Sequence, residues 1–367
     1  MKKNEVKPLT GLRGIAAYCI LVSHAITISF TYNSVNPLQA YATRLAYFGM
    51  SLFFILSGFV IYFNYHNVIK VEGYILGGYK FIVSRIARLY PLYLLMILFT
   101  LDKVPSKLFS EQPFALFSYL TMTQSWFNLQ MITFPPAWSI STEWFFYFAF
   151  IFMLPLFEKI KKPLLALSIF SILIFLTIPF YIQFQTNYYT TPDGWITYFS
   201  PFTRIFEFIT GMLACKAHLK SKIERGGGAS GYHQLFITLC SVSCLIIVIF
   251  DPFDQTTYSI LNSNFIYAPF IAPLIYLLST YESRLSRALS SKILMFMGEI
   301  SYSVYLLGFM IMTGLGAVYV NGEPSMTAYL NSTFKVLIII TFTTFIAYGC
   351  YNLFEKPARK WVRKKLA

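Results

Sequence analysis

Long apolar runs recur along almost the whole chain, and short polar segments separate them. Each run is about 20 residues long or longer, the length that an α-helix needs to cross the hydrocarbon core of a bilayer. The pattern therefore predicts a bundle of about ten transmembrane helices. The predicted spans are 10–31, 45–65, 82–101, 135–157, 163–183, 200–218, 233–251, 263–281, 293–319 and 333–354.

One further apolar stretch, 108–126, contains charged and amide side chains and a proline, so hydropathy alone leaves its role open. The basic residues decide between the two topologies, because cytoplasmic loops are enriched in Lys and Arg. With ten spans and a cytoplasmic N-terminus, the outer side keeps only Arg44, Lys103, Lys107, Arg204 and Lys335 of the 29 Lys and Arg. If 108–126 crossed the membrane, this bias would largely cancel. We therefore predict a re-entrant or interfacial segment there, and cytoplasmic N- and C-termini.

The composition supports the same fold class. The 367 residues are 56% hydrophobic and 12% charged, with a mean hydropathy of +0.59, whereas soluble domains carry about 25% charged residues. We expect an all-α integral protein of the cell (inner or plasma) membrane, with one transmembrane domain over 1–367, a core at 10–357 and no appended soluble domain. The net charge of +14 then reflects topology and contact with anionic membrane lipids, so nucleic acid is not expected as a partner.

The sequence lacks the motifs of several common types of functional site. The five cysteines lie in apolar runs, and their odd number argues against a disulfide framework. The four histidines form no His-Glu-x-x-His motif, and there is no Cys-x-x-Cys pair, so no metal site is expected. A P-loop and a Gly-x-Ser-x-Gly elbow are also missing. An enzyme built from this chain would have to use histidine, carboxylate and arginine side chains.

The first predicted span contains two ionisable side chains on one face. Arg13 and His24 are eleven residues apart, which is about three helical turns, or some 16 Å along the axis. An imidazole near the middle of a membrane is costly, and such a group is by default a candidate functional residue. The alternative is structural: Arg13 would be a basic anchor at a helix end, and His24 a hydrogen-bonded packing residue.

Glu143 is the second candidate of this kind. It lies about eight residues inside the outer end of its predicted span, so we expect it at a depth similar to that of His24. A carboxylate beside an imidazole fixes its tautomer and raises its basicity. A purely structural buried pair is the alternative. Arg204 and Glu207, three residues apart on one helix face, are predicted to form a local structural ion pair.

Arg85 and Arg88 share one helix face at the cytoplasmic end of the third predicted span. Two guanidinium groups that point the same way suit the binding of phosphate. Anchoring of a helix end by positive charge is the competing interpretation, although an anchor does not require both residues to lie on one face.

Five short motifs together resemble the membrane acyltransferase-3 family, and they follow one another in the order of that family from residue 10 to residue 357. They are Arg13-x10-His24; Arg85-x-x-Arg88; Trp138–Tyr147, with Trp138, Ser139 and Glu143; Gly298–Leu306, with Ser301 and Tyr302; and Phe354–Pro357, with Glu355.

The resemblance implies transfer of an acyl group, usually acetyl, from cytoplasmic acyl-CoA to a hydroxyl of a carbohydrate. Acetyl-CoA would be a donor substrate, with no permanently bound cofactor. The acceptor would be a surface glycan such as O-antigen or exopolysaccharide, or its lipid-linked precursor. Arg13, Arg85 and Arg88 would bind the CoA phosphates, His24 would deprotonate the hydroxyl, and Glu143 would orient the imidazole. The supporting residues would be Trp138, Ser139, Ser301, Tyr302 and Glu355.

Two departures from the family pattern affect this interpretation. Family members often carry a histidine shortly after the Ser-Tyr segment, where this chain has Gly308 or a neighbour, so His24 is expected to be the sole base. Many relatives also carry a C-terminal hydrolase-like domain, whereas this sequence ends ten residues after Pro357. Transfer to the final acceptor is therefore expected within the membrane domain itself.

Two other classes of protein remain as alternatives. A proton-coupled transporter or flippase of a glycan or lipid precursor would use His24, Glu143 and Glu207 as a proton relay. The sequence shows neither an inverted repeat nor a pair of interrupted helices, which speaks against a transporter. A structural scaffold would not require His24 and Glu143 to lie at a similar depth in the membrane.

Overall fold

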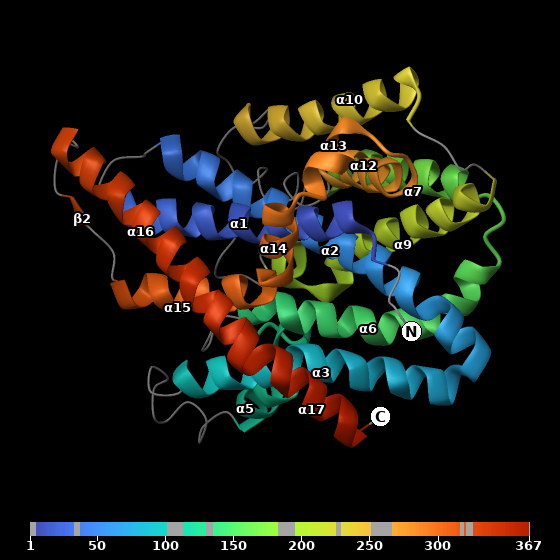
Figure 1. Cartoon of the computed structure of the whole chain (residues 1–367), viewed down its shortest axis with the longest axis horizontal. Helices are drawn as coiled ribbons and strands as arrows, with labels where there is room; N and C mark the ends of the chain where they lie inside the picture. The colour runs from blue at the N-terminus through green and yellow to red at the C-terminus, as the bar shows by residue number, and fades with distance from the viewer. Residues whose placement is uncertain are drawn as a thin grey trace.

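The computed structural model shows a bundle of helices that run mostly along one direction (Figure 1). It describes residues 5–32, 37–100, 113–129, 135–182, 195–224, 229–250, 266–315, 319–320 and 326–366. Within these ranges the fold is helical, apart from two short strands. The strands, β1 (Thr31–Tyr32) and β2 (Tyr319–Val320), pair in parallel and join the ends of two helices that are far apart in the sequence.

Each of the ten predicted ranges contains a helix. The long helices are α1 (Lys7–Ser29), α2 (Pro37–Glu72), α3 (Tyr74–Thr100), α6 (Ala137–Glu158), α7 (Pro163–Ile182), α9 (Pro201–Glu224), α10 (Gly231–Ile249) and α16 (Met326–Cys350). The shorter elements are α5 (Pro113–Leu120), η2 (Gln124–Trp126), η3 (Trp195–Phe199), α12 (Ala268–Thr280), α13 (Arg284–Leu289), α14 (Lys292–Glu299), α15 (Ser301–Leu315), η4 (Tyr351–Glu355) and α17 (Lys356–Leu366).

The helices support a membrane protein, but they do not confirm a count of about ten spans. Among the described residues, six helices are long and apolar enough to cross a membrane, and seven if the bent pair α14–α15 counts as one span. The two helices of that pair meet at an angle of 65°. α12 is shorter than a span, and α9, which carries Arg204 and Glu207, is not among the six.

The ambiguous stretch 108–126 contains no long helix in its described part. α5 is eight residues long, far short of a membrane crossing. The turn that follows it packs on the first turn of α6, where Gln124 Nε2 donates to the Ala137 carbonyl at 3.0 Å and Ser125 Oγ donates to the Trp138 carbonyl at 2.8 Å. The segment thus covers the N-terminal end of α6. Residues 108–112 lie outside the described ranges.

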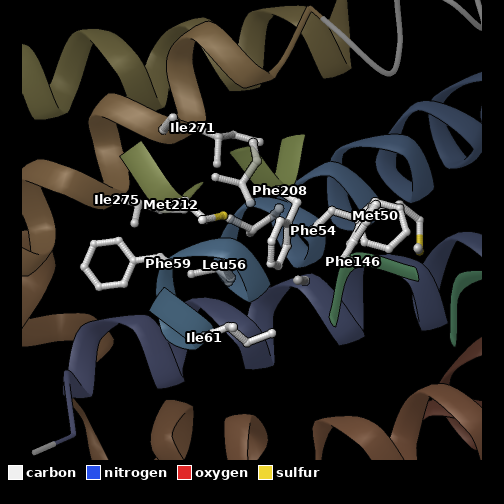
Figure 2. Packing of buried hydrophobic residues seen from close by; sticks show 14 of the residues in the cluster. Met50, Phe54, Leu56, Phe59, Ile61, Phe146, Phe208, Met212, Ile271 and Ile275 are labelled. Atoms are coloured by element: carbon white, nitrogen blue, oxygen red, sulfur yellow. The ribbon is translucent and has the colours of Figure 1, made fainter. Parts of the chain in front are cut away.

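The centre of the molecule is formed by α2, which packs against α1 on one side and α9 on the other. Gly58 of α2 faces the backbone of Phe208, and Gly211 of α9 faces the backbone of Ile55, so the two helices approach closely where a side chain would collide. Figure 2 shows the core around this contact, where side chains from four helices interdigitate. The labelled residues are Met50, Phe54, Leu56, Phe59, Ile61, Phe146, Phe208, Met212, Ile271 and Ile275.

The axial position of α6 determines which side chains meet at the site. Phe54 of α2 packs edge-on against both Trp138 and Phe146, with ring centroids 6.0 and 5.2 Å apart. The first turn of α6 therefore lies beside the middle of α2. The predicted depth of Glu143 was counted from the end of its span, on the assumption that α6 begins at the same end of the bundle as α2. In the structure α6 begins further inside the bundle.

Candidate active site

A cavity of about 350 Å³ lies between α1, α2, α3, α6 and the C-terminal helices. It gathers segments from residue 5 to residue 359, so the early and late motifs of the sequence meet in one place. Eight of the ten predicted site residues line it: Arg13, Arg85, Arg88, Ser139, Glu143, Ser301, Tyr302 and Glu355. His24 and Trp138 are not among its lining residues.

The cavity is elongated and differs in character between its ends. Its lining on α2 runs from Met50 to Asn64, which corresponds to about 20 Å at the helical rise. Arg85 contacts Tyr65, next to Asn64 at one end, and the wall near Met50 is apolar, with Phe53 and Phe54. A ligand that fits this shape would have a polyanionic end and a long, uncharged arm.

Arg13 connects α1 to the corner between α14 and α15. Its Nε donates to the Gly298 carbonyl at 3.0 Å and to Ser301 Oγ at 3.1 Å, and its Nη2 donates to the same carbonyl at 2.5 Å. A side chain at Gly298 would collide with the backbone of Thr10, so the corner can lie directly on α1 only with glycine there. The late glycine–serine–tyrosine motif thus holds Arg13 through neutral oxygens.

Arg85 and Arg88 both line the cavity, as their spacing on one helix face predicts. Arg85 is 3% exposed and lies over the Tyr65 ring at 4.8 Å, while its Nη2 donates to the Tyr65 hydroxyl at 2.7 Å. Its Nε is buried and has no hydrogen-bond partner among the described residues. Arg88 is half-buried and forms neither a hydrogen bond nor an ion pair within the described ranges.

Glu143 has a partner that the sequence analysis did not foresee. Its Oε1 accepts a hydrogen bond from Ser57 Oγ at 2.8 Å, and it lies close enough to Arg85 and Tyr147 to interact with both electrostatically. Near the apolar end, Ser139 Oγ and the Tyr305 hydroxyl are 2.8 Å apart.

The other supporting residues tie the late motifs to the rest of the bundle. The Tyr302 hydroxyl donates to the Leu89 carbonyl on α3 at 2.7 Å. Ser303 Oγ donates to Glu355 Oε2 at 2.6 Å, and this contact joins α15 to η4. Both contacts connect segments that are remote in the sequence, so these residues keep the walls of the cavity together.

His24 lies elsewhere in the bundle. It is exposed, and within the described part of the chain it makes no hydrogen bond or ion pair. Gly49 of α2 packs against Ala16 and Ile20 of α1, and this contact allows the depths of His24 and Ser57 to be compared. Ser57 lies about 12 Å from Gly49 in one direction and His24 about 9 Å in the other, so they are roughly 20 Å apart along the bundle.

The expectation that Glu143 and His24 lie at one depth is therefore wrong, and the expected contact between them is not formed. Glu143 is bound to Ser57, on the side where α1 begins. The cause is the axial position of α6, whose first turn lies beside Phe54 in the middle of α2. The position of a side chain along the bundle cannot be inferred from its distance to the helix end when that end lies inside the molecule.

Trp138 belongs to the aromatic packing next to the cavity. Its ring contacts Phe54 and Tyr198, and Arg204 lies over it at 5.9 Å. Arg204 and Glu207 form the predicted ion pair, with Arg204 Nη1 3.3 Å from the carboxylate and both side chains fully buried. The pair is thus enclosed by rings and helps to fix α9 against α6.

Among the lining residues that were not predicted as site residues, three contribute polar groups to the proposed site: Ser57, Tyr305 and Arg359. Ser57 carries no sequence signal, because a serine in an apolar helix is common. Tyr305 lies inside the matched late motif but was not singled out. Arg359 was not singled out, although its four-residue spacing from Arg363 puts the two on one helix face. A spacing of this kind identified Arg85 and Arg88.

Comparisons with known proteins agree with this picture. The family model Acyl_transf_3, described as an acyltransferase domain, matches residues 7–352. Acyltransferase MdmB of Streptomyces mycarofaciens is 27% identical over 326 residues, which are 83% of this chain and 78% of that protein. O-acetyltransferase OatA of Staphylococcus aureus is 26% identical over 387 residues, 96% of this chain.

The match spans 57% of the length of OatA. No solved structure matches the chain significantly. The family model covers nearly the whole chain, and several of the described helices are apolar enough to cross a membrane. The chain therefore belongs to the membrane acyltransferase-3 family and is an acyltransferase.

Proposed function

We propose that the protein transfers an acetyl group from acetyl-CoA to a hydroxyl of a cell-surface or lipid-linked carbohydrate. The observation that carries this proposal is that Arg13, Arg85 and Arg88 line one cavity whose wall near Met50 and Phe53 is apolar. The relative named an O-acetyltransferase supports an oxygen acceptor and acetyl as the transferred group.

The charged end of the cavity suits the phosphates of CoA. Glu143 attracts Arg85 and Glu355 attracts Arg13. Within the described ranges, however, no carboxylate forms a direct ion pair with Arg13, Arg85 or Arg88. Guanidinium groups bind phosphate oxygens in a bidentate way. The apolar end, lined by Met50 and Phe53, would take the uncharged arm that carries the thioester.

The distribution of basic residues sets the orientation. With ten spans in the cell membrane and both termini cytoplasmic, the start of α1 and the end of α17 lie on the cytoplasmic side. Glu5 and Arg359, which line the charged end of the cavity, then face the compartment that supplies CoA thioesters. His24 lies further toward the outer side, where the carbohydrate acceptor approaches.

His24 is the proposed general base. It takes the proton of the acceptor hydroxyl as the oxygen attacks the thioester carbonyl. The C–S bond then breaks, and CoA leaves as a thiolate that takes up a proton. The apolar end of the cavity stops roughly 10 Å short of His24 along α1. Leu21, about one helical turn before His24, contacts Gly308. In this proposal the thioester arm passes that contact to reach the imidazole.

Glu143 acts as a positioning residue at the donor side. Through Ser57 and the nearby Arg85 it orders the wall of the cavity, and it does not touch the imidazole. In this proposal, transfer to the carbohydrate takes place within the membrane domain, from residue 10 to residue 357.

The test is transfer of radiolabelled acetyl from acetyl-CoA by the purified protein in proteoliposomes that contain envelope carbohydrate. We expect alkali-labile label on the carbohydrate, because the product is an ester, and none with His24→Ala. A protein that inserts correctly and binds the acceptor but never accepts acetyl from acetyl-CoA would contradict the proposal. Uptake of a glycan or lipid precursor without acetylation would favour the transporter alternative.

A further inference from the structure

The C-terminal helix α17 packs across α3, the helix that carries Arg85 and Arg88 (Figure 1). Two hydrogen bonds fix it there. The Tyr79 hydroxyl donates to the Leu366 carbonyl at 2.9 Å, and Arg363 Nη2 donates to Ser84 Oγ at 2.7 Å. α17 is therefore docked on the wall of the cavity and is not a free basic tail.

The docked face of α17 carries a second pair of arginines. Arg359 and Arg363 are four residues apart, so they lie on one face of the helix. Arg359 lines the cavity. Arg363 donates to the hydroxyl of Ser84, which also accepts a hydrogen bond from Arg85 Nη2 at 3.4 Å. Arg359 thus lines the same cavity as the arginine pair of α3, and Arg363 binds the serine next to Arg85.

The arginines of α3 and α17 lie close enough together to repel one another. Arg359 is repelled by Arg88, Arg363 and Arg85, and each of these interactions is larger than its attraction to Glu355. Within the described ranges no carboxylate forms an ion pair with any of these four arginines. The Nε atoms of Arg85 and Arg363 are buried without a hydrogen-bond partner there.

Three of the four acidic residues that line the cavity accept a hydrogen bond from a neighbouring hydroxyl. Glu355 Oε2 accepts from Ser303 at 2.6 Å, Glu143 Oε1 accepts from Ser57 at 2.8 Å, and Glu5 Oε1 accepts from Thr10 at 2.8 Å. Buried charges without an opposite charge are costly. An arrangement that holds four guanidinium groups together therefore suits a ligand with more than one negative charge.

We propose that Arg359 is a fourth arginine of the phosphate-binding site, beside Arg13, Arg85 and Arg88, and that Arg363 positions it by binding Ser84. The inference rests on the proposed acyl-CoA donor and deepens it. The ligand class is a thioester with several phosphate groups, and α17 contributes binding of the phosphates only. A donor without phosphates has no contact with this helix.

α17 supplies its own matched control. Lys360 and Lys364 are also four residues apart on this helix, but both are exposed, and neither lines the cavity. Replacing Lys360 with Gln removes one positive charge next to Arg359 in sequence. It therefore reproduces any general loss of charge at the membrane surface, and it leaves the cavity intact.

The experiment compares two donors with the same thioester arm, acetyl-CoA and S-acetylpantetheine, which lacks the phosphates. For Arg359→Gln we expect the KM for acetyl-CoA to rise at least about tenfold with kcat unchanged, since a charge-assisted contact is lost. The rate with S-acetylpantetheine should not change. Arg359→Lys should fall between wild type and Gln, and Lys360→Gln should match wild type with both donors.

Direct titration of CoA into the purified protein separates the possible failures. If wild type binds CoA and Arg359→Gln binds it equally well, this inference is overturned and the proposed donor stands. If wild type binds no CoA, the proposed donor itself is wrong. Equal losses with acetyl-CoA and S-acetylpantetheine would also overturn the inference, because they would show that Arg359 only supports the fold.

Discussion

Ser57 Oγ donates a hydrogen bond to Glu143 Oε1 at 2.8 Å, and this contact joins α2 to α6 in the wall of the cavity. The glutamate of the tryptophan–serine–glutamate motif is therefore bound on the arginine side of the site, roughly 20 Å along the bundle from His24. The proposed roles are therefore separate: His24 acts as the base on the acceptor hydroxyl, and Glu143 positions the wall of the donor site.

A double-mutant cycle tests whether Ser57 acts through Glu143. We expect Glu143→Gln to lower acetyl transfer less than His24→Ala, because it disturbs the donor wall and leaves the base in place. Ser57→Ala should show part of the Glu143→Gln loss. The double variant should be no worse than Glu143→Gln alone, since contacting residues are not additive. Losses in kcat/KM that simply multiply would show that the two side chains act independently.

His24 provides the most direct test of the chemistry. Loss of a general base costs about 10²–10⁴ in rate, so His24→Ala should insert normally and lose nearly all transfer. His24→Gln retains hydrogen bonding but cannot accept the proton, and it should be almost as inactive. CoA binding, measured by titration, should stay at the wild-type level, because His24 does not line the cavity. An active His24→Gln enzyme would rule out the catalytic role.

The arginine pair of α3 is tested through donor affinity. Replacing both Arg85 and Arg88 with Gln removes charge-assisted hydrogen bonds worth about 1.5–3 kcal/mol each, so the KM for acetyl-CoA should rise at least about tenfold. The KM for the acceptor should not change. An unchanged donor KM in a variant that still inserts would identify the pair as a membrane anchor.

The close contact between α2 and α9 predicts a change in stability. A side chain at Gly211 would collide with the backbone of Ile55, so Gly211→Ala should destabilise the protein by about 1–3 kcal/mol. Gly349→Ala is the matched control, because nothing lies within 4 Å of the added carbon in α16. Thermal unfolding in detergent should separate the two variants, and equal melting temperatures would contradict the packing.

Topology is tested with reporters. A fusion at Ala367 should report a cytoplasmic location, and a tag within 102–107, which lies outside the described residues, should be labelled from outside. The reason is the excess of Lys and Arg in the loops assigned to the cytoplasm. External labelling of the C-terminus would contradict the ten-span arrangement and place the charged end of the cavity on the wrong side for CoA.

Local sequence patterns were enough to place the helices and to indicate which residues share a face. Every predicted apolar range contains a helix, because helix formation depends on backbone hydrogen bonds within the segment and on an apolar surface. The same local periodicity put Arg85 and Arg88 on one side of α3, where both line the cavity. It also paired Arg204 with Glu207, and the structure confirms that ion pair.

The relative depth of side chains on different helices was decided only by tertiary packing. Phe54 holds the first turn of α6 beside the middle of α2, and this position takes Glu143 away from His24 and toward Ser57. The return of α17 onto α3 brings Arg359 to a cavity whose other arginines lie far away in the sequence. Such contacts depend on the shapes of side chains from remote segments, and periodicity within one helix carries no information about them.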